Sequence, residues 1–189
     1  IFSKEAVLRG AFDKYATGKR RRGTQEVDEA FLEEIEQWRE HLAKAIASKN
    51  PNLTDTELNS SVQKIIDRIV FLRICEDRRI EPYGRLEALL NGHNVYPRLK
   101  EQFQQADAKY NSGLFHFKME RGREEEPDEV TLGLIIEDKP LKEIIGGLYL
   151  PKSPYEFSVL PADILGQVYE QFLGKVIRRT PSGRAVVEE

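Results

Sequence analysis

Cysteine, methionine and tryptophan are scarce in this chain of 189 residues, which contains one of each. The single cysteine, Cys75, excludes an internal disulfide bond and a zinc site built from several cysteines, and it suits a reducing cytosol. No apolar run approaches the length needed to span a bilayer, and no signal peptide opens the chain. These absences predict a cytoplasmic protein without a membrane partner.

The chain also lacks an overall excess of positive charge, because its net charge is −3 although 32% of its residues are charged. Contact with nucleic acid would therefore have to come from a local basic patch. Two segments offer one, a glycine-flanked run and the segment that begins at position 175. The candidate DNA-binding residues are Lys19, Arg20, Arg21, Arg22, Lys175, Arg178 and Arg179. The alternative for the glycine-flanked run is a solvated loop.

The stretch Val62–Arg78 predicts the central helix of the fold. Its apolar residues recur at helical spacing and form one broad stripe, and further apolar residues lie on the opposite side, so the helix should be buried inside a bundle. The stripe consists of Val62, Ile65, Ile66, Ile69 and Leu72.

Charged residues follow the apolar stripe in the last turn of this helix. Arg73 continues the centre of the stripe, and Glu76 and Asp77 flank it at spacings of three and four residues, which allow ion pairs on one helix face. Buried charges are costly unless they are paired. Two interpretations follow: an internal ion-pair network at a helix end, or a network that docks a neighbouring domain.

Other segments predict a mainly all-α fold, an irregular helical bundle with a minor C-terminal β-hairpin and a long charged loop. The central helix has a strong start signal, since Thr54 and Glu57 form a capping box after the stop at Asn50-Pro51. Residues 120–129 predict a mobile charged loop. Residues 130–136 are β-prone or simply extended. Further helices are expected over 6–15, 27–48, 85–90, 96–110, 141–150 and 165–173, and the hairpin over 175–180 and 184–188.

One constellation suggests metal-dependent chemistry. Pro127-Asp128 followed by Glu137-Asp138-Lys139 matches the PD…ExK pattern of Mg²⁺-dependent nucleases, in which Asp128 and Glu137 would hold the metal and Lys139 would steady the attacking water. Such short acidic patterns are common in a highly charged chain, and a mobile loop does not hold metal ligands in the fixed geometry that they need. His41, His93 and His116 lie far apart in the sequence and are expected to be surface or capping residues. The residues themselves therefore do not indicate an enzyme, a resident metal or a cofactor.

Five ordered blocks of the sequence resemble a known family. They are DRIVFLRICEDR (Asp67–Arg78), IEPYGRL (Ile80–Leu86), YNSGLFHF (Tyr110–Phe117), LKEIIGGLYLPKSPYEFSVLP (Leu141–Pro161) and ILGQVYEQFLGKVI (Ile164–Ile177). Together they resemble the helical segment that lies between the nuclease and the N6-adenine DNA methyltransferase domain in large single-chain type II restriction–modification enzymes.

The resemblance implies a non-catalytic connector, with S-adenosylmethionine and Mg²⁺ used by the parent protein rather than by this fragment. Its implied partners are the flanking nuclease and methyltransferase domains of the same chain, and DNA. The parent would be a site-specific DNA (adenine-N6) methyltransferase with type II endonuclease activity. The family's Gly-rich first methyltransferase motif would follow Val186–Glu189 and its nuclease acids would precede Ile1, so no catalytic residue of the family falls on this chain.

On this basis we expect three parts: residues 1–26, a helix and basic loop at the end of an upstream region; residues 27–174, a helical spacer domain; and residues 175–189, the start of a hairpin that leads into an absent methyltransferase domain. We expect the chain to be a piece of a longer protein. Two alternative functions stay open, a small Mg²⁺-dependent nuclease of the PD-ExK type and a protein-interaction helical bundle.

Overall fold

The computed structural model describes residues 24–110, 112–119, 126–153 and 175–188, together with Tyr155, Phe157, Gly166 and Glu170. The chain divides into two compact units, Ile1–Glu34 and Ile35–Glu189. In the first unit only the start of one helix is described. Apart from the first residues of that helix, the elements described below belong to the second unit. The expected helix over 6–15 and most of the one over 165–173 lie outside the described residues.

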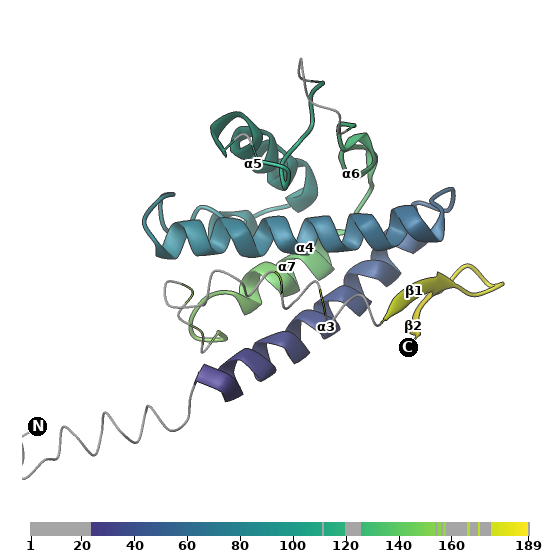
Figure 1. The fold of residues 1–189 in the computed structure, drawn as a ribbon, viewed down its shortest axis with the longest axis horizontal. Helices are drawn as coiled ribbons and strands as arrows, with labels where there is room; N and C mark the ends of the chain where they lie inside the picture. Colours follow the sequence, from purple (N-terminus) through teal and green to yellow (C-terminus); the bar gives the residue numbers. More distant parts are fainter. Residues whose placement is uncertain are drawn as a thin grey trace, which may run out of the picture. The chain divides into compact units, whose positions relative to one another are not determined.

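Two long helices are joined by the short loop 50–54. α3 covers Thr24–Lys49, and α4 covers Asp55–Asp77 and returns in the opposite direction, diverging from the second half of α3 (Figure 1). The predicted capping box is confirmed, because Glu57 N–H donates to the Thr54 hydroxyl over 3.2 Å while Thr54 N–H donates to the Glu57 carboxylate over 2.8 Å. These bonds satisfy backbone N–H groups at the start of α4 that have no partner inside the helix.

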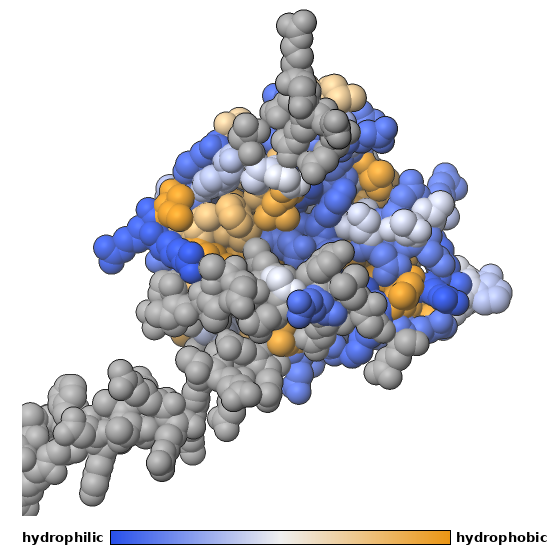
Figure 2. Space-filling view, viewed as in Figure 1, coloured by the Kyte–Doolittle hydropathy of each residue, from blue (hydrophilic) through white to orange (hydrophobic). Residues whose placement is uncertain are grey.

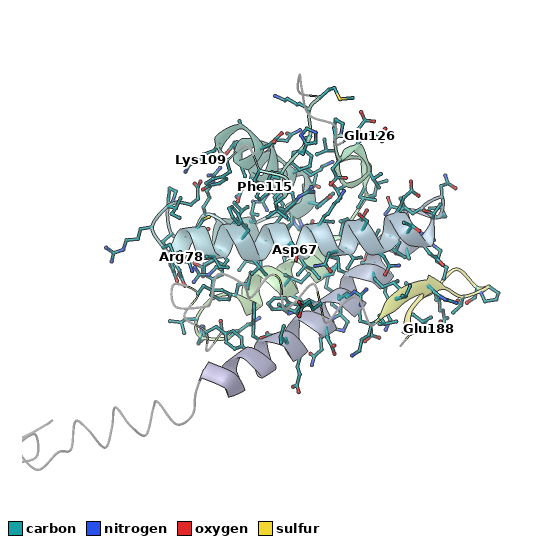
Figure 3. The ribbon with its side chains drawn as sticks, viewed as in Figure 1. Asp67, Arg78, Lys109, Phe115, Glu126 and Glu188 are labelled. Carbon is teal, nitrogen blue, oxygen red and sulfur yellow. The ribbon has the colours of Figure 1, made fainter. Side chains whose placement is uncertain are left out.

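The predicted stripe of α4 is the centre of the core. Val62, Ile65, Ile66 and Ile69 are completely buried, and α4 packs against β1 on one side and α6 on another. Figure 3 shows Phe115, from the segment after α5, between α4 and α5. Removing this apolar surface from water is the main favourable contribution to folding.

Three further helices form a second packed group. η1 (Glu87–Leu90, a 3-10 helix), α5 (Val95–Tyr110) and α7 (Asp138–Gly147) pack against one another. The first turn of α7 also caps α5, because the Asp138 carboxylate accepts hydrogen bonds from Asn94 N–H (3.0 Å) and Val95 N–H (2.8 Å). The sequence analysis did not predict this cap.

The segment 128–136 differs from the prediction. Residues 130–136 were expected to be a strand or extended, but Glu129–Gly133 form the short helix α6, and only residues 134–137 are extended. Asp128, placed in a mobile loop by its charged neighbours, is 7% exposed and caps α6 by accepting Thr131 N–H over 3.2 Å. The β-branched residues misled the prediction because a helix cap and a buried partner determine the local structure here.

The C-terminal hairpin is confirmed. β1 (Val176–Arg179) and β2 (Ala185–Glu188) pair antiparallel, with Ile177 opposite Val187. Gly183 in the turn has φ +79°, a backbone conformation that residues with a Cβ rarely adopt. Figure 2 shows apolar side chains at the strands and pale ones, of intermediate hydropathy, at the turn. The mainly helical fold class is thus confirmed.

None of the helices in the described residues combines the length and the apolar character that crossing a membrane requires.

Candidate functional site

The last turn of α4 carries the ion pairs that the sequence predicted. Arg73 lies 3.9 Å from the Glu76 carboxylate and forms a closer ion pair with Asp77. Its Nε donates to the Leu148 carbonyl over 3.0 Å. Three aromatic rings surround its guanidinium carbon. Their centroids lie 5.1 Å (Tyr83), 4.4 Å (Tyr149) and 5.1 Å (Phe157) from that carbon. Aromatic faces stabilise a cation that has lost its water.

Glu76 and Asp77 bind backbone and hydroxyl groups of distant segments. Glu76 accepts Leu86 N–H over 2.7 Å, Gly84 N–H over 3.1 Å and the Tyr149 hydroxyl over 2.5 Å. Burial and this hydroxyl bond to Glu76 raise the pKa of Tyr149. Asp77 accepts the backbone N–H of Phe157 over 3.0 Å. The end of α4 therefore holds the loop after α4 and the segment after α7 in place.

The surface beside this network exposes apolar side chains next to the exposed Arg78 and Arg79. Arg73 and Glu76 are 4% and 2% exposed, whereas Ile80, Tyr83 and Leu150 are 51%, 62% and 76% exposed. The structure thus contains the internal ion-pair network of the first interpretation. The domain-docking role of Arg73, Glu76 and Asp77 stays a prediction, and Arg73 and Glu76 are too deeply buried to meet a neighbour directly.

A second buried arginine on α4 forms a network that the sequence analysis missed. Arg68 is 1% exposed, and its guanidinium donates to the Asp128 carboxylate (2.7 Å), the Thr131 hydroxyl (2.9 Å) and the Leu114 carbonyl (2.8 Å). The ring of Phe117 lies 4.6 Å from its guanidinium carbon. Burial alone would raise the pKa of Asp128, but the bonds from Thr131 and Arg68 outweigh it and hold that pKa below its usual value.

The two carboxylates of the nuclease pattern engage different cations. Asp128 binds Arg68 and lies 3.5 Å from the ammonium of Lys64, while the exposed Glu137 lies 2.9 Å from that of Lys49. Among the described residues, no group of three or more His, Cys, Asp or Glu side chains is arranged to hold a metal ion. These contacts do not support a shared Mg²⁺ site at Asp128 and Glu137, because Arg68 engages one carboxylate and Lys49 the other.

The expected DNA-binding residues of the hairpin have partners within the chain. The Lys175 ammonium lies 2.7 Å from Glu36, and Arg178 Nε lies 3.6 Å from Glu188. The Arg179 guanidinium donates to the carbonyl of Ala47 (3.2 Å), in the last turn of α3, and to that of Asn50 (2.7 Å), just after the helix. Arg178 is the most exposed of the three, and the basic run Lys19–Arg22 lies outside the described residues.

An asparagine on α4 fastens the hairpin to the two long helices. The Asn59 amide donates to the Ile177 carbonyl over 2.7 Å and accepts Ile177 N–H over 2.9 Å, as a neighbouring β-strand would. Arg39 of α3 donates both to Asn59 (3.2 Å) and to the Lys175 carbonyl (2.7 Å). The backbone of β1 is therefore paired on both edges, with β2 and with Asn59.

One histidine prediction is wrong. His116, expected at the surface or at a cap, is 4% exposed, and its carbonyl accepts Asp128 N–H over 2.7 Å. It is buried because the segment after α5 turns back onto α4 to cover the Arg68 network. His41 and His93 are exposed, at 3.5 Å from Glu143 and 3.9 Å from Asp138.

Comparison with known proteins supports a relationship of this chain to the restriction–modification enzymes. The relative that carries it is the type II restriction enzyme and methyltransferase RM.Eco57I of Escherichia coli, which is 34% identical over 189 residues. The match covers 100% of this chain and 18% of the relative, so the chain spans less than a fifth of that protein. No family model and no solved structure matches the chain.

Proposed function

We propose that this chain is a non-catalytic helical connector of a restriction–modification protein, which acts in the cytoplasm. It sets the distance and orientation between a nuclease module and an adenine-specific DNA methyltransferase module of one longer polypeptide, and it contacts the DNA backbone. S-adenosylmethionine and Mg²⁺ belong to those modules and not to this chain.

The observation that carries the proposal is the extent of the similarity. It runs along all of this chain but accounts for only 18% of the relative, which is described as both a restriction enzyme and a methyltransferase. A segment of that size within a protein of two activities suits a part that joins them.

The contacts inside the fold support a connector for a second reason. A connector transmits position only if its own elements do not shift. Here α4 is tied to α6 by Arg68 and Asp128, to the segment after α7 by Arg73, and to the hairpin by Asn59. Each tie joins residues 60 or more positions apart. The two arginine contacts are buried and the Asn59 contact is partly buried, and hydrogen bonds in such places are costly to break.

The test is to purify the chain and incubate it with duplex DNA, once with Mg²⁺ and once with S-adenosylmethionine. We expect neither strand cleavage nor methyl transfer to adenine. Mg²⁺-dependent cleavage that Asp128→Ala abolished in a folded variant would instead favour the nuclease alternative. Methylation by the chain alone would contradict the proposal directly.

A further inference from the structure

A groove lies between the C-terminal end of α3 and the hairpin. Its volume is about 720 Å³. The α3 side contributes Lys44 and Ser48, and the hairpin contributes Arg179, Ser182, Arg184 and Val186. Both walls are fixed, because Arg179 binds the last carbonyls of α3 and Asn59 binds β1.

The lining of this groove carries positive charge without negative charge. Lys44, Arg179 and Arg184 line it, and no aspartate or glutamate does. Among the described residues, no carboxylate forms an ion pair with Arg179 or Arg184. In a chain of net charge −3, such a patch is a local exception.

Two of the cations are available to a ligand. Arg184 is exposed in the hairpin turn, and no hydrogen bond of its guanidinium is made within the described residues. Lys44 pairs with Glu40, but both side chains are about half exposed, at 54% and 48%. An exposed ion pair of this kind contributes little, so a phosphate can compete for the ammonium.

Arg179 has a different role. Its terminal nitrogens are used on the Ala47 and Asn50 carbonyls, and its Nε is buried without a hydrogen-bond partner in the described part of the chain. Because those carbonyls are uncharged, the positive charge of Arg179 is not neutralised, and it adds to the field in the groove.

We propose that this groove binds the phosphate backbone of double-stranded DNA, with Lys44 and Arg184 contacting phosphate oxygens and Arg179 positioning the hairpin. This inference rests on the proposed function and gives its DNA contact a place. Arginine and lysine are the usual partners of DNA phosphates, and such contacts fix register without reading sequence. The lining offers only small apolar side chains and no aromatic ring, whereas interfaces between proteins rely on large aromatic residues at their centre.

The test compares two double variants with the same change in charge. Lys44→Gln/Arg184→Gln removes the groove cations, and Lys118→Gln/Arg78→Gln removes two exposed cations elsewhere. Arg78 lies at the other end of α4 from the hairpin, as the positions of Arg78 and Glu188 in Figure 3 show. Thermal unfolding of all three proteins checks that each variant is folded.

Binding is measured by fluorescence anisotropy with a labelled duplex of about 25 base pairs, from about 50 to 200 mM salt. The groove variant should bind roughly tenfold or more weakly at the lowest salt. The slope of log affinity against log salt concentration should be smaller in magnitude by about one for each lost phosphate contact. The control variant should bind like the unaltered chain.

Four results would overturn the inference: no binding by the unaltered chain at low salt, no loss in the groove variant, an equal loss in the control, or equally tight binding of polyglutamate. The last result would identify an acidic protein as the ligand. The first result would also contradict the DNA contact in the proposed function. The other three would leave it standing, and the connector role itself is tested separately, by catalytic activity and product geometry.

Discussion

Two arginines on α4, Arg68 and Arg73, are almost completely withdrawn from solvent. An isolated buried cation costs several kcal/mol, so each needs a carboxylate, a carbonyl and aromatic faces to replace its water. For Arg68 the carboxylate is that of Asp128 and the carbonyl that of Leu114. For Arg73 the carboxylate is that of Asp77 and the carbonyl that of Leu148. Removing one member of either set leaves the others buried and uncompensated.

We expect Asp128→Ala to lower the free energy of unfolding by about 3–5 kcal/mol, because it leaves the Arg68 guanidinium buried without its carboxylate. The double variant Arg68→Met/Asp128→Ala should lose clearly less than the sum of the losses in Arg68→Met and Asp128→Ala, since it removes both charges together. Urea denaturation of the unaltered chain, the two single variants and the double variant measures this coupling.

The control for this cycle is Lys64→Met. Lys64 also lies near Asp128, at 3.5 Å, but is 42% exposed, so its removal should cost no more than about 1 kcal/mol. A loss for Asp128→Ala as small as that for Lys64→Met would show that the buried pair does not hold α6 to α4.

A third charged group on α4 makes stability depend on pH. Burial raises the pKa of Asp67 to about 6, although the Gln63 amide donates to both carboxylate oxygens, over 2.8 and 2.9 Å, and Arg68 is nearby. An aspartate in the unfolded chain titrates near pH 3.9. Between these values the folded state binds a proton that the unfolded state does not, so this group makes stability fall as pH rises from about 4 to 6.

We therefore expect Asp67→Asn to remove a component of stability that changes by up to about 1.4 kcal/mol per pH unit in this window. The measurement is the urea midpoint at several pH values, with Asp55→Asn, an exposed residue of the same helix, as the control. Parallel curves for the unaltered chain and Asp67→Asn would contradict the assignment. The lowered pKa of Asp128 acts in the opposite direction, and only below the pH window of Asp67.

At the scale of elements, the parts predicted well from the sequence depend on neighbours in the chain. The stripe of α4, the capping box at Thr54, the turn at Gly183 and the ion pairs of Arg73 all involve residues a few positions apart. Periodicity and local spacing contain that information.

The parts that were missed depend on contacts between distant residues. Asp128 is 60 positions from Arg68, and Asp138 is more than 40 from the α5 start that it caps. Asp128 was interpreted through its immediate neighbours, as a loop charge or a nuclease ligand, and Asp138 was given no role. An acidic residue three positions before Thr131 was a usable signal for a helix cap, but nothing local indicated Arg68 as its partner.

The attachment of the hairpin makes a prediction at this scale. Asn59→Ala leaves the Ile177 N–H and carbonyl without partners, which should cost about 1–3 kcal/mol and loosen β1 from α4. We expect faster hydrogen exchange at Ile177 while the amides in the middle of α4 keep their protection. Ser60→Ala, a change at an exposed neighbour, should leave the stability and the hydrogen exchange at Ile177 unaltered. Unchanged exchange at Ile177 in Asn59→Ala would show that β1 is held by other contacts.

At the scale of the whole molecule, the described residues form a group of helices whose buried charges join segments far apart in the sequence. A two-stranded hairpin is marginal by itself, and here it is held by side chains of α3 and α4. In the proposed longer polypeptide, the direction in which the hairpin leaves the helices determines where the following module lies.

The most direct test of the connector is the geometry of the reaction products. In the longer polypeptide that the proposal requires, the distances between the methylated adenine and the cleaved bond would be measured for the unaltered protein, Asn59→Ala and Ser60→Ala. The account predicts that Asn59→Ala broadens the spread of cleavage positions while methylation continues, and that Ser60→Ala does not. An unchanged spread in Asn59→Ala, with hydrogen exchange confirming that β1 has loosened, would contradict the claim that this chain sets the distance between the two activities.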